Sequence, residues 1–199
     1  DMKNISEIKL DGNYVQNIFL NKNKLIVFVP VSKYMATGVP CGMGIVGMPC
    51  GGYYKEQIEV LIYNVENKES ITLENKIKVS GYYVDARMVG DYVYLISSKN
   101  VGLDQIGFPS YEVNDKVTSI PAKDIYYFGH YDSSYNFNII SAINVNSGEI
   151  NTETYLMGTS TNLYASENNI YLTYMKTISP EYFFNKYLED VLMPNLPQE

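Results

Sequence analysis

The sequence predicts an all-β protein made of repeated four-stranded antiparallel sheets, with a short helix at the C-terminal end. Three observations support this fold class. Short runs of alternating apolar and polar residues recur along the chain, most clearly in residues 76–98, where two strand-like runs meet at Gly90. That hairpin recurs loosely twice more when the chain is aligned on Gly12, Gly81 and Gly158. The chain also has 20 tyrosines and no tryptophan, and tyrosine suits a pleated, half-buried surface.

The first half of the chain contains a series of expected strands, separated by polar turns. They are residues 8–10, 14–20, 24–30, 58–65 and 71–79, followed by the two runs of 76–98. We group the four strands between residues 58 and 98 into one set. Residues 31–57 are rich in glycine and lack a sustained period, so they are expected to form a loop insertion.

The second half repeats this organisation after another irregular stretch, residues 99–123, which we expect to be a second insertion. The strands expected after it are residues 125–128, 137–145, 149–157, 163–166 and 170–175. Residues 179–193 then change to helical spacing, with Ser179 as N-cap and Pro180 as first helical residue. Coverage of part of one bare sheet face by the apolar side of this helix is an alternative to association through that face.

The repeat length favours propeller blades over a sandwich. The three aligned glycines lie 69 and 77 residues apart, and removing insertions of 27 and 25 residues leaves 42 and 52. A propeller blade has four strands and about 40 to 50 residues, and a ring needs about four to eight blades. Residues 1–199 are therefore expected to be about two and a half blades, a fragment of a larger propeller. Its bare faces predict self-association or association with the remaining blades.

Composition and charge exclude several classes of function. The formal net charge is -7 and the sequence pI is about 4.8, so the chain would repel nucleic acid. No apolar run reaches the roughly 18 residues of a bilayer span, so no membrane span is expected. Arg87 is the only arginine and His130 the only histidine, which limits catalytic schemes. The chain begins at Asp1 and is expected to be trimmed, by signal cleavage or by design of the expressed segment.

Three segments carry a resemblance to a known family. They are SGYYVDARMVGDYVYLIS (80–97), PAKDIYYFGHYDSSYNFNIISAINVNSGEI (121–150) and MGTSTNLYASENNIYLTY (157–174). In this order they resemble the secreted β-propeller domain family of archaea and some bacteria, whose function is not established. The family usually has serine where Ala86 stands. The resemblance covers most of this chain and implies a propeller fold and a secreted or cell-surface location.

The first insertion contains a near-mirror motif, VPCGMGIVGMPCGG, with two cysteines nine positions apart. In an exported protein Cys41 and Cys50 are expected to form a disulfide, which would contribute about 2 to 3 kcal/mol against a disordered loop. The alternative is a copper site, because two thiolates with the thioethers of Met43 and Met48 match the ligands that Cu(I) prefers. Methionine also fills irregular apolar space, so the disulfide is the favoured interpretation.

Two groups of polar residues are candidate sites. Asp85 and Arg87 lie two apart on an expected strand, so both side chains leave one face; we expect a structural ion pair between blades rather than an anion site. His130 and Asp132 supply residue types of a hydrolase, and Asp132 with two asparagines, Asn136 and Asn138, supplies oxygen ligands for calcium. Neither the hydrolase pattern nor the calcium pattern has the spacing that its chemistry requires. We therefore interpret these residues as the ordinary polar residues of a surface loop.

Tyrosines near loops and strand ends are the remaining functional signal. The expected ligand-binding rim consists of Tyr53, Tyr54, Tyr126, Tyr127 and Tyr131. A rigid aromatic ring with a polar tip loses little entropy on binding. The sequence thus favours an exported, non-enzymatic module for protein or glycan binding or cell-surface structure, with no cofactor. The alternatives are an extracellular hydrolase and a copper-binding protein.

Overall fold

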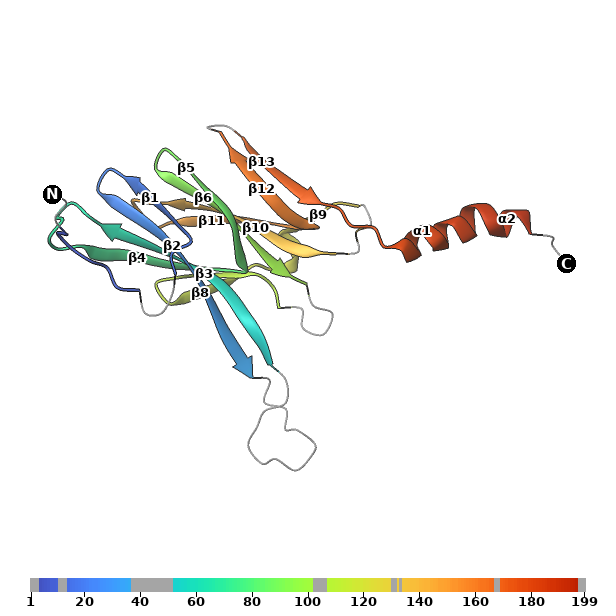
Figure 1. The fold of residues 1–199 in the computed structure, drawn as a ribbon, viewed down its shortest axis with the longest axis horizontal. Coiled ribbons are helices and arrows are strands. Elements are labelled where there is room, and N and C mark those ends of the chain that lie inside the picture. The colour runs from blue at the N-terminus through green and yellow to red at the C-terminus, as the bar shows by residue number, and fades with distance from the viewer. Residues whose placement is uncertain are drawn as a thin grey trace, which may run out of the picture.

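The structure is a computed structural model that describes residues 4–10, 14–36, 52–101, 107–129, 132, 134–166 and 169–196. These residues form largely antiparallel β-sheets followed by one helical segment, as the sequence predicts (Figure 1). Each of the three sheets begins with a hairpin, and the three hairpins follow one another across the molecule (Figure 1). The sheets themselves pack face to face.

The first sheet has the strand order β1-β2-β3-β4-β7-β8. Its first four strands form an antiparallel meander: β1 (Asn17–Asn21), β2 (Lys24–Ala36), β3 (Gly52–Asn64) and β4 (Thr72–Ser80). A later hairpin, β7 (Ser110–Val113) and β8 (Lys116–Ser119), adds to the outer edge of β4. Its two-residue turn has positive φ at Asn114 and Asp115, which matches the right-handed twist of the strands that it joins.

The second sheet repeats the meander, and the third contains one hairpin. The second has the order β5-β6-β10-β11-β9, with β5 (Tyr82–Val89), β6 (Tyr92–Asn100), β10 (Asn136–Asn144), β11 (Ile150–Met157) and β9 (Ile125–Tyr127). Among the described strands of this sheet, β9 alone pairs in parallel, on the outer edge of β11. The third consists of β12 (Thr159–Ala165) and β13 (Ile170–Met175).

Gly81 and Gly158 mark the boundaries between sheets. Gly81 has φ +93° and connects the last strand of the first meander to the first strand of the second. A Cβ there would lie 2.4 Å from the carbonyl oxygen of Ser98, so only glycine fits. Our grouping of the strands between residues 58 and 98 into one set is therefore wrong. The alternating pattern is the same on both sides of Gly81, so the sequence does not distinguish a crossing between sheets from continuation within one sheet.

The main core lies between the first two sheets. Most of the large side chains that are completely buried lie in this layer. They include Phe28, Ile58 and Ile77 from the first sheet and Leu95 and Ile139 from the second. A smaller cluster on the outer face of the first sheet packs around Val29 and Leu61, and the N-terminal segment covers part of it through Ile8 and Leu10. Apolar burial at roughly 25 cal/mol per Å² is the main force holding the first two sheets together.

Neither expected insertion is irregular along its whole length. Residues 31–36 and 52–57 continue β2 and β3 as a two-stranded arm that projects from the sheet (Figure 1). Residues 99–123 contain β7, β8 and a 3-10 turn at Ala122–Asp124, and Ile120 is buried in the main core. This second segment runs from the second sheet to the edge of the first and back, so it ties the two sheets together. Its strands were missed because four residues are too few to show a period.

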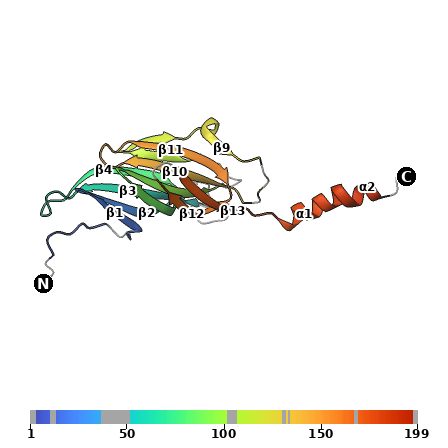
Figure 2. The same ribbon diagram turned by 90° about the horizontal axis from the view of Figure 1, so that it is seen from above.

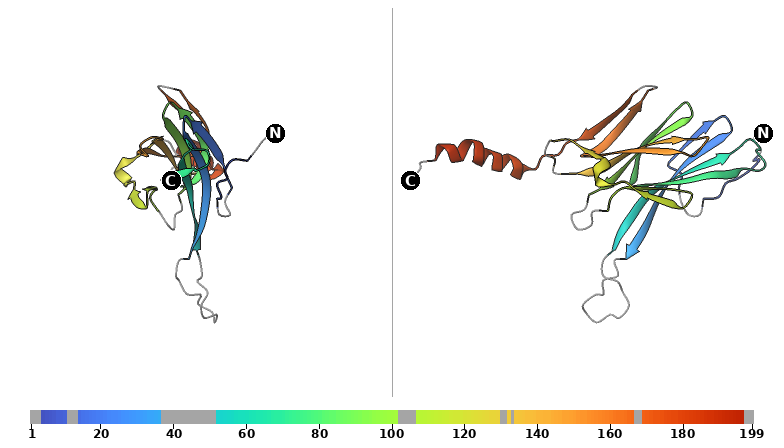
Figure 3. Two further views of the ribbon diagram at one scale, coloured as in Figure 1. Left: turned by 90° about the vertical axis from the view of Figure 1, so that its left-hand side faces the viewer. Right: turned by 180° about the vertical axis from the view of Figure 1, so that it is seen from behind.

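The C-terminal segment forms α1 (Pro180–Tyr187), a π-helical turn (Leu188–Leu192) and α2 (Met193–Asn195). Ser179 caps it as expected, its side chain accepting from the backbone N–H of Tyr182. The helix extends away from the sheets in Figures 1 and 2 and in the right-hand view of Figure 3, and none of its residues is buried. It does not cover a sheet face, so that alternative is wrong: Phe183 and Phe184 stay 59% and 62% exposed.

Candidate binding surface

Part of the expected rim lies on the outer edge of the second sheet. Tyr126 and Tyr127 occupy β9 and are 58% and 76% exposed, and Phe128 follows them at 48%. We call these three residues the β9 ridge. Because side chains alternate along a strand, Tyr126 and Tyr127 leave opposite faces of the sheet.

Stacking fixes two of the three ridge residues. The ring of Tyr126 stacks on Tyr155 of β11, with centroids 5.3 Å apart and planes 26° apart. Phe128 stacks on Tyr174 of β13 at 6.2 Å and 4°. The ridge thus joins strands of the second and third sheets, and two of its rings have partners that limit their rotation.

Tyr155 is itself held by a carboxylate two residues away. Its hydroxyl donates to Glu153 Oε2 at 2.8 Å, since both side chains leave the same face of β11. This bond, helped by partial burial, raises the pKa of Tyr155 to about 12, because ionisation would place two negative charges together. Sequence reasoning missed Tyr155, although an alternating Glu-x-Tyr on a strand was a usable signal.

Tyr54 belongs to a different surface. It lies on the projecting arm, is 67% exposed and packs edge-on against Tyr34 of the neighbouring strand, with centroids 5.4 Å apart. Figure 1 shows the arm pointing away from β9, so the expected single rim is divided into separate surfaces. The side chain of Tyr53 and the whole of Tyr131 lie outside the described residues.

The motif with Cys41, Met43, Met48 and Cys50 also lies outside the described residues, so the disulfide and copper interpretations stay predictions. Among the described residues, no group of three or more His, Cys, Asp or Glu side chains is placed to hold a metal.

Asp85 and Arg87 do contact each other, but on a single strand. Arg87 Nη1 lies 2.8 Å from Asp85 Oδ1 and also donates to the carbonyl oxygen of Ala86 at 2.9 Å. The arginine side chain is 47% exposed. The contact is therefore a partly solvated pair within β5 rather than a link between sheets, and we expect it to contribute little to stability.

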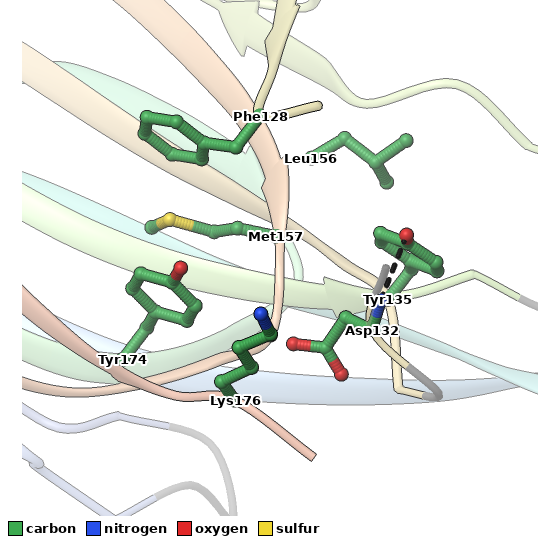
Figure 4. A pocket seen from close by; sticks show the side chains of 8 residues that line it. Phe128, Asp132, Tyr135, Leu156, Met157, Tyr174 and Lys176 are labelled. Carbon is green, nitrogen blue, oxygen red and sulfur yellow. Dashed lines mark hydrogen bonds between the residues drawn. The ribbon is translucent and has the colours of Figure 1, made fainter. Parts of the chain in front are cut away.

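Asp132 anchors a loop to the end of the third sheet. Its Oδ1 accepts from the backbone N–H of Ser134 at 2.9 Å and from that of Thr177 at 3.2 Å. The residue is 5% exposed and lines a cavity of about 10 Å³ beside Tyr174 and Lys176 (Figure 4). That volume holds about one water molecule, not a substrate. His130 lies outside the described residues.

Asn136 and Asn138 form hydrogen bonds to the start of the third sheet. Asn136 Nδ2 donates to Thr159 Oγ1 at 3.0 Å, and Asn138 Nδ2 donates to the carbonyl oxygen of Gly158 at 3.0 Å. The oxygen of Asn138 accepts from the backbone N–H of Ser160 at 3.2 Å. These amides join the second and third sheets, which gives them a structural use.

A larger groove lies between the second sheet and the β12–β13 hairpin. It has a volume of about 420 Å³. The residues that line it are Tyr94, Ile140, Ala142, Asn151, Glu153, Tyr155, Ser166, Asn169 and Ile170. Its floor is the face of β6, β10 and β11 that points away from the main core, since the core residues Leu95 and Ile139 alternate with the floor residues.

These sheets define a propeller-type protein: largely antiparallel sheets packed face to face, with the second and third entered directly after Gly81 and Gly158. The family comparison agrees, because the profile of the β-propeller domain family matches residues 1–191, and the chain belongs to that family. An uncharacterized protein of Methanocaldococcus jannaschii is 29% identical over 142 residues, which is 71% of this chain and 22% of that protein. The chain thus spans about a fifth of its relative's length.

No solved structure matches the chain. Within the described part, the helical segments lack the length and apolar character that a bilayer-crossing helix requires.

Proposed function

We propose that this propeller module is a non-enzymatic binding module at the cell exterior and that the β9 ridge is its contact surface. The observation that carries the proposal is the run of three consecutive exposed aromatic residues, Tyr126, Tyr127 and Phe128, on the outer edge of a rigid sheet. Loops and edges on a rigid scaffold are where binding residues concentrate.

The ridge is pre-organised for binding. Tyr126 is stacked on Tyr155, and Tyr155 is hydrogen-bonded to Glu153, while Phe128 is stacked on Tyr174. Ordering a free side chain at an interface costs about 0.5 to 1.5 kcal/mol, so rings that are already held reduce this cost.

A protein partner fits the ridge best. Tyrosine is enriched among the residues that dominate protein interfaces, where the ring is buried and the hydroxyl reaches a polar group. The net charge of -7 favours a partner with a neutral or basic contact surface. The exterior location rests on the resemblance to a secreted family and on the expected disulfide between Cys41 and Cys50.

The test compares the chain with a Tyr126→Ser/Tyr127→Ser double variant. Both are immobilised and exposed to the surface-protein fraction of the source organism, and a Tyr14→Ser/Tyr171→Ser variant serves as control because those tyrosines are also exposed. We expect a specific protein that binds wild type and control and is lost from the ridge variant. Equal capture by all three would contradict the proposal, and saturable binding on a glycan array would replace the protein by a glycan.

The hydrolase alternative has its own test. A panel of ester, peptide and glycoside substrates is assayed with wild type, His130→Ala and Asp132→Ala. We expect no activity above that of a denatured control. Hydrolysis by wild type that disappears in either variant would overturn the non-enzymatic proposal.

A further inference from the structure

Three lysines from different strands lie near the base of the projecting arm. Lys33 of β2 is directly opposite Lys55 of β3, so their side chains leave the same face of the arm side by side. Lys99 lies near the end of β6, in the second sheet. Burial and the nearby charge of Lys55 together lower the pKa of Lys99, so Lys55 neighbours both of the other lysines. We call these three residues the lysine cluster.

The ammonium group of Lys99 is held in place but is not neutralised. Its Nζ donates to the carbonyl oxygens of Gly107 and Phe108, at 3.3 Å for the oxygen of Phe108. Both acceptors are uncharged, and the charge that acts on Lys99 is that of a second cation, Lys55. An ammonium group has three N–H donors, so one donor of Lys99 remains for a ligand.

No member of the lysine cluster forms an ion pair with a carboxylate in the described part of the chain. The cations that do form such pairs there are Lys22, Lys24, Lys76, Lys78 and Arg87. Acidic partners are in surplus, because the chain has 22 acidic residues and 15 lysines and arginines. Like charges directly opposite each other destabilise a pair of strands. A ligand of opposite charge would remove this repulsion.

Protection of a free strand edge explains only part of the lysine cluster. Lysines on exposed strands hinder pairing with other chains, and Lys33 and Lys55 lie on an arm of two strands. Lys99 does not fit this explanation, because β6 is an interior strand that lies between β5 and β10. Three cations from two sheets therefore indicate a binding role.

The charge and the donors of the cluster fit a phosphate or sulfate group. Such a group offers three or more acceptor oxygens, one for each ammonium, whereas a carboxylate offers two. Lysine binds phosphate as a compact point charge. We propose that the lysine cluster binds a phosphate or sulfate group, either as a free ion or on a larger ligand. This site is separate from the β9 ridge, because the arm points away from β9 (Figure 1).

Three probes distinguish a free ion from a group on a larger ligand. Inorganic phosphate, inorganic sulfate and a sulfated heparin fragment are each titrated into the ¹⁵N-labelled protein. Binding is followed by NMR of the backbone amides, and sodium chloride keeps the ionic strength constant. Polyglutamate with the same net charge as the heparin fragment reports attraction to negative charge alone.

Matched variants separate the lysine cluster from general charge. Lys33→Gln/Lys55→Gln and Lys99→Gln each remove part of the cluster. Lys116→Gln/Lys123→Gln and the single Lys116→Gln remove the same charge at exposed positions of β8 and of the 3-10 turn. Circular dichroism checks that each variant is folded.

We expect saturable shifts at residues around Lys55 and Lys99. Each cluster variant should raise the dissociation constant about ten-fold or more, because a charge-assisted hydrogen bond is lost. The control variants should change it less than about two-fold. Binding should also raise the pKa of Lys99, because a neighbouring negative charge favours the protonated amine. The Tyr126→Ser/Tyr127→Ser variant should bind as wild type does, so this site and the ridge are tested independently.

The outcomes of the titrations decide the proposal. Saturation by either inorganic ion supports a site for a free ion. Saturation by the heparin fragment alone, weakened by the cluster variants, supports a group on a larger ligand. No saturable binding of any probe, equal binding of polyglutamate, or equal effects of the cluster and control variants would overturn the proposal.

Discussion

Asn138 donates a hydrogen bond of 3.0 Å to the carbonyl oxygen of Gly158, and this bond joins the second sheet to the start of the third. Asn138 is 0% exposed, and its other amide atom accepts from Ser160 at 3.2 Å. One side chain thus satisfies a backbone acceptor and a backbone donor at the place where the chain crosses between sheets. Asn138 therefore helps to hold the start of the third sheet against the second.

Replacing Asn138 with alanine should lower the free energy of unfolding by about 2 to 4 kcal/mol, because two buried backbone groups lose their partner. Urea denaturation measures the change. Asn162→Ala is the control, since Asn162 is exposed and bonds only to neighbouring hydroxyls, and it should cost under about 0.5 kcal/mol. Equal effects of the two substitutions would contradict the role given to Asn138.

Gly81 and Gly90 form a second matched pair. Both have positive φ, +93° and +58°, but a Cβ at Gly81 would lie 2.4 Å from the Ser98 carbonyl oxygen, whereas Gly90 has open space. Gly90→Ala should cost about 1 kcal/mol from backbone strain alone. Gly81→Ala should cost several times more, because the clash is with backbone and the sheets must shift. Similar unfolding midpoints for the two variants would rule out a tight crossing at Gly81.

The repeat of the first hairpins could be predicted from sequence, because Gly81 and Gly158 each precede a period-two run. The sequence could not predict that the chain crosses between sheets at these glycines, because the strands on either side have the same alternation. At Gly81 it is the close approach to Ser98 that marks the crossing. The strands of β7 and β8 were missed because their pattern is too short. Their pairing with β4 is a long-range contact that leaves no local signal.

The candidate surface was predicted in part. Adjacent tyrosines leave opposite faces of a strand, so at least half of them were expected in the core, whereas Tyr126 and Tyr127 are both exposed. Which tyrosines lie together depends on sheet order, since β9 pairs with β11, a strand from later in the chain. That pairing, invisible in the sequence, brings Tyr126 onto Tyr155 and separates it from Tyr54.

The Tyr155–Glu153 bond gives a pH dependence at the alkaline end. The pKa of Tyr155 is raised from 10.0 to about 12, so the folded state holds the phenol proton more tightly than the unfolded state. The stabilisation is complete below pH 10 and is lost as the pH rises from there through about 12. Ring-carbon NMR titration should show the pKa of Tyr155 falling towards 10 in Glu153→Gln. An unchanged value would exclude the carboxylate as the cause.

The two cysteines make a prediction that thiol chemistry can check. Protein prepared under oxidising conditions, then unfolded without reductant, should show no titratable thiol if Cys41 and Cys50 are bonded. Reduction should release two. Two free thiols before reduction would remove the disulfide, and copper present in stoichiometric amount in the purified protein would favour the metal site with Met43 and Met48.

Amide hydrogen exchange of β13, followed by NMR, tests most directly that the chain is a propeller segment with an open third sheet. The amides of Tyr171 and Thr173 bond to β12, whereas those of Ile170 and Leu172 point outward. The account predicts that the outward pair exchanges about a hundred-fold faster than the inward pair. Equal protection of all four amides would contradict it, because the edge would then already be paired within the chain.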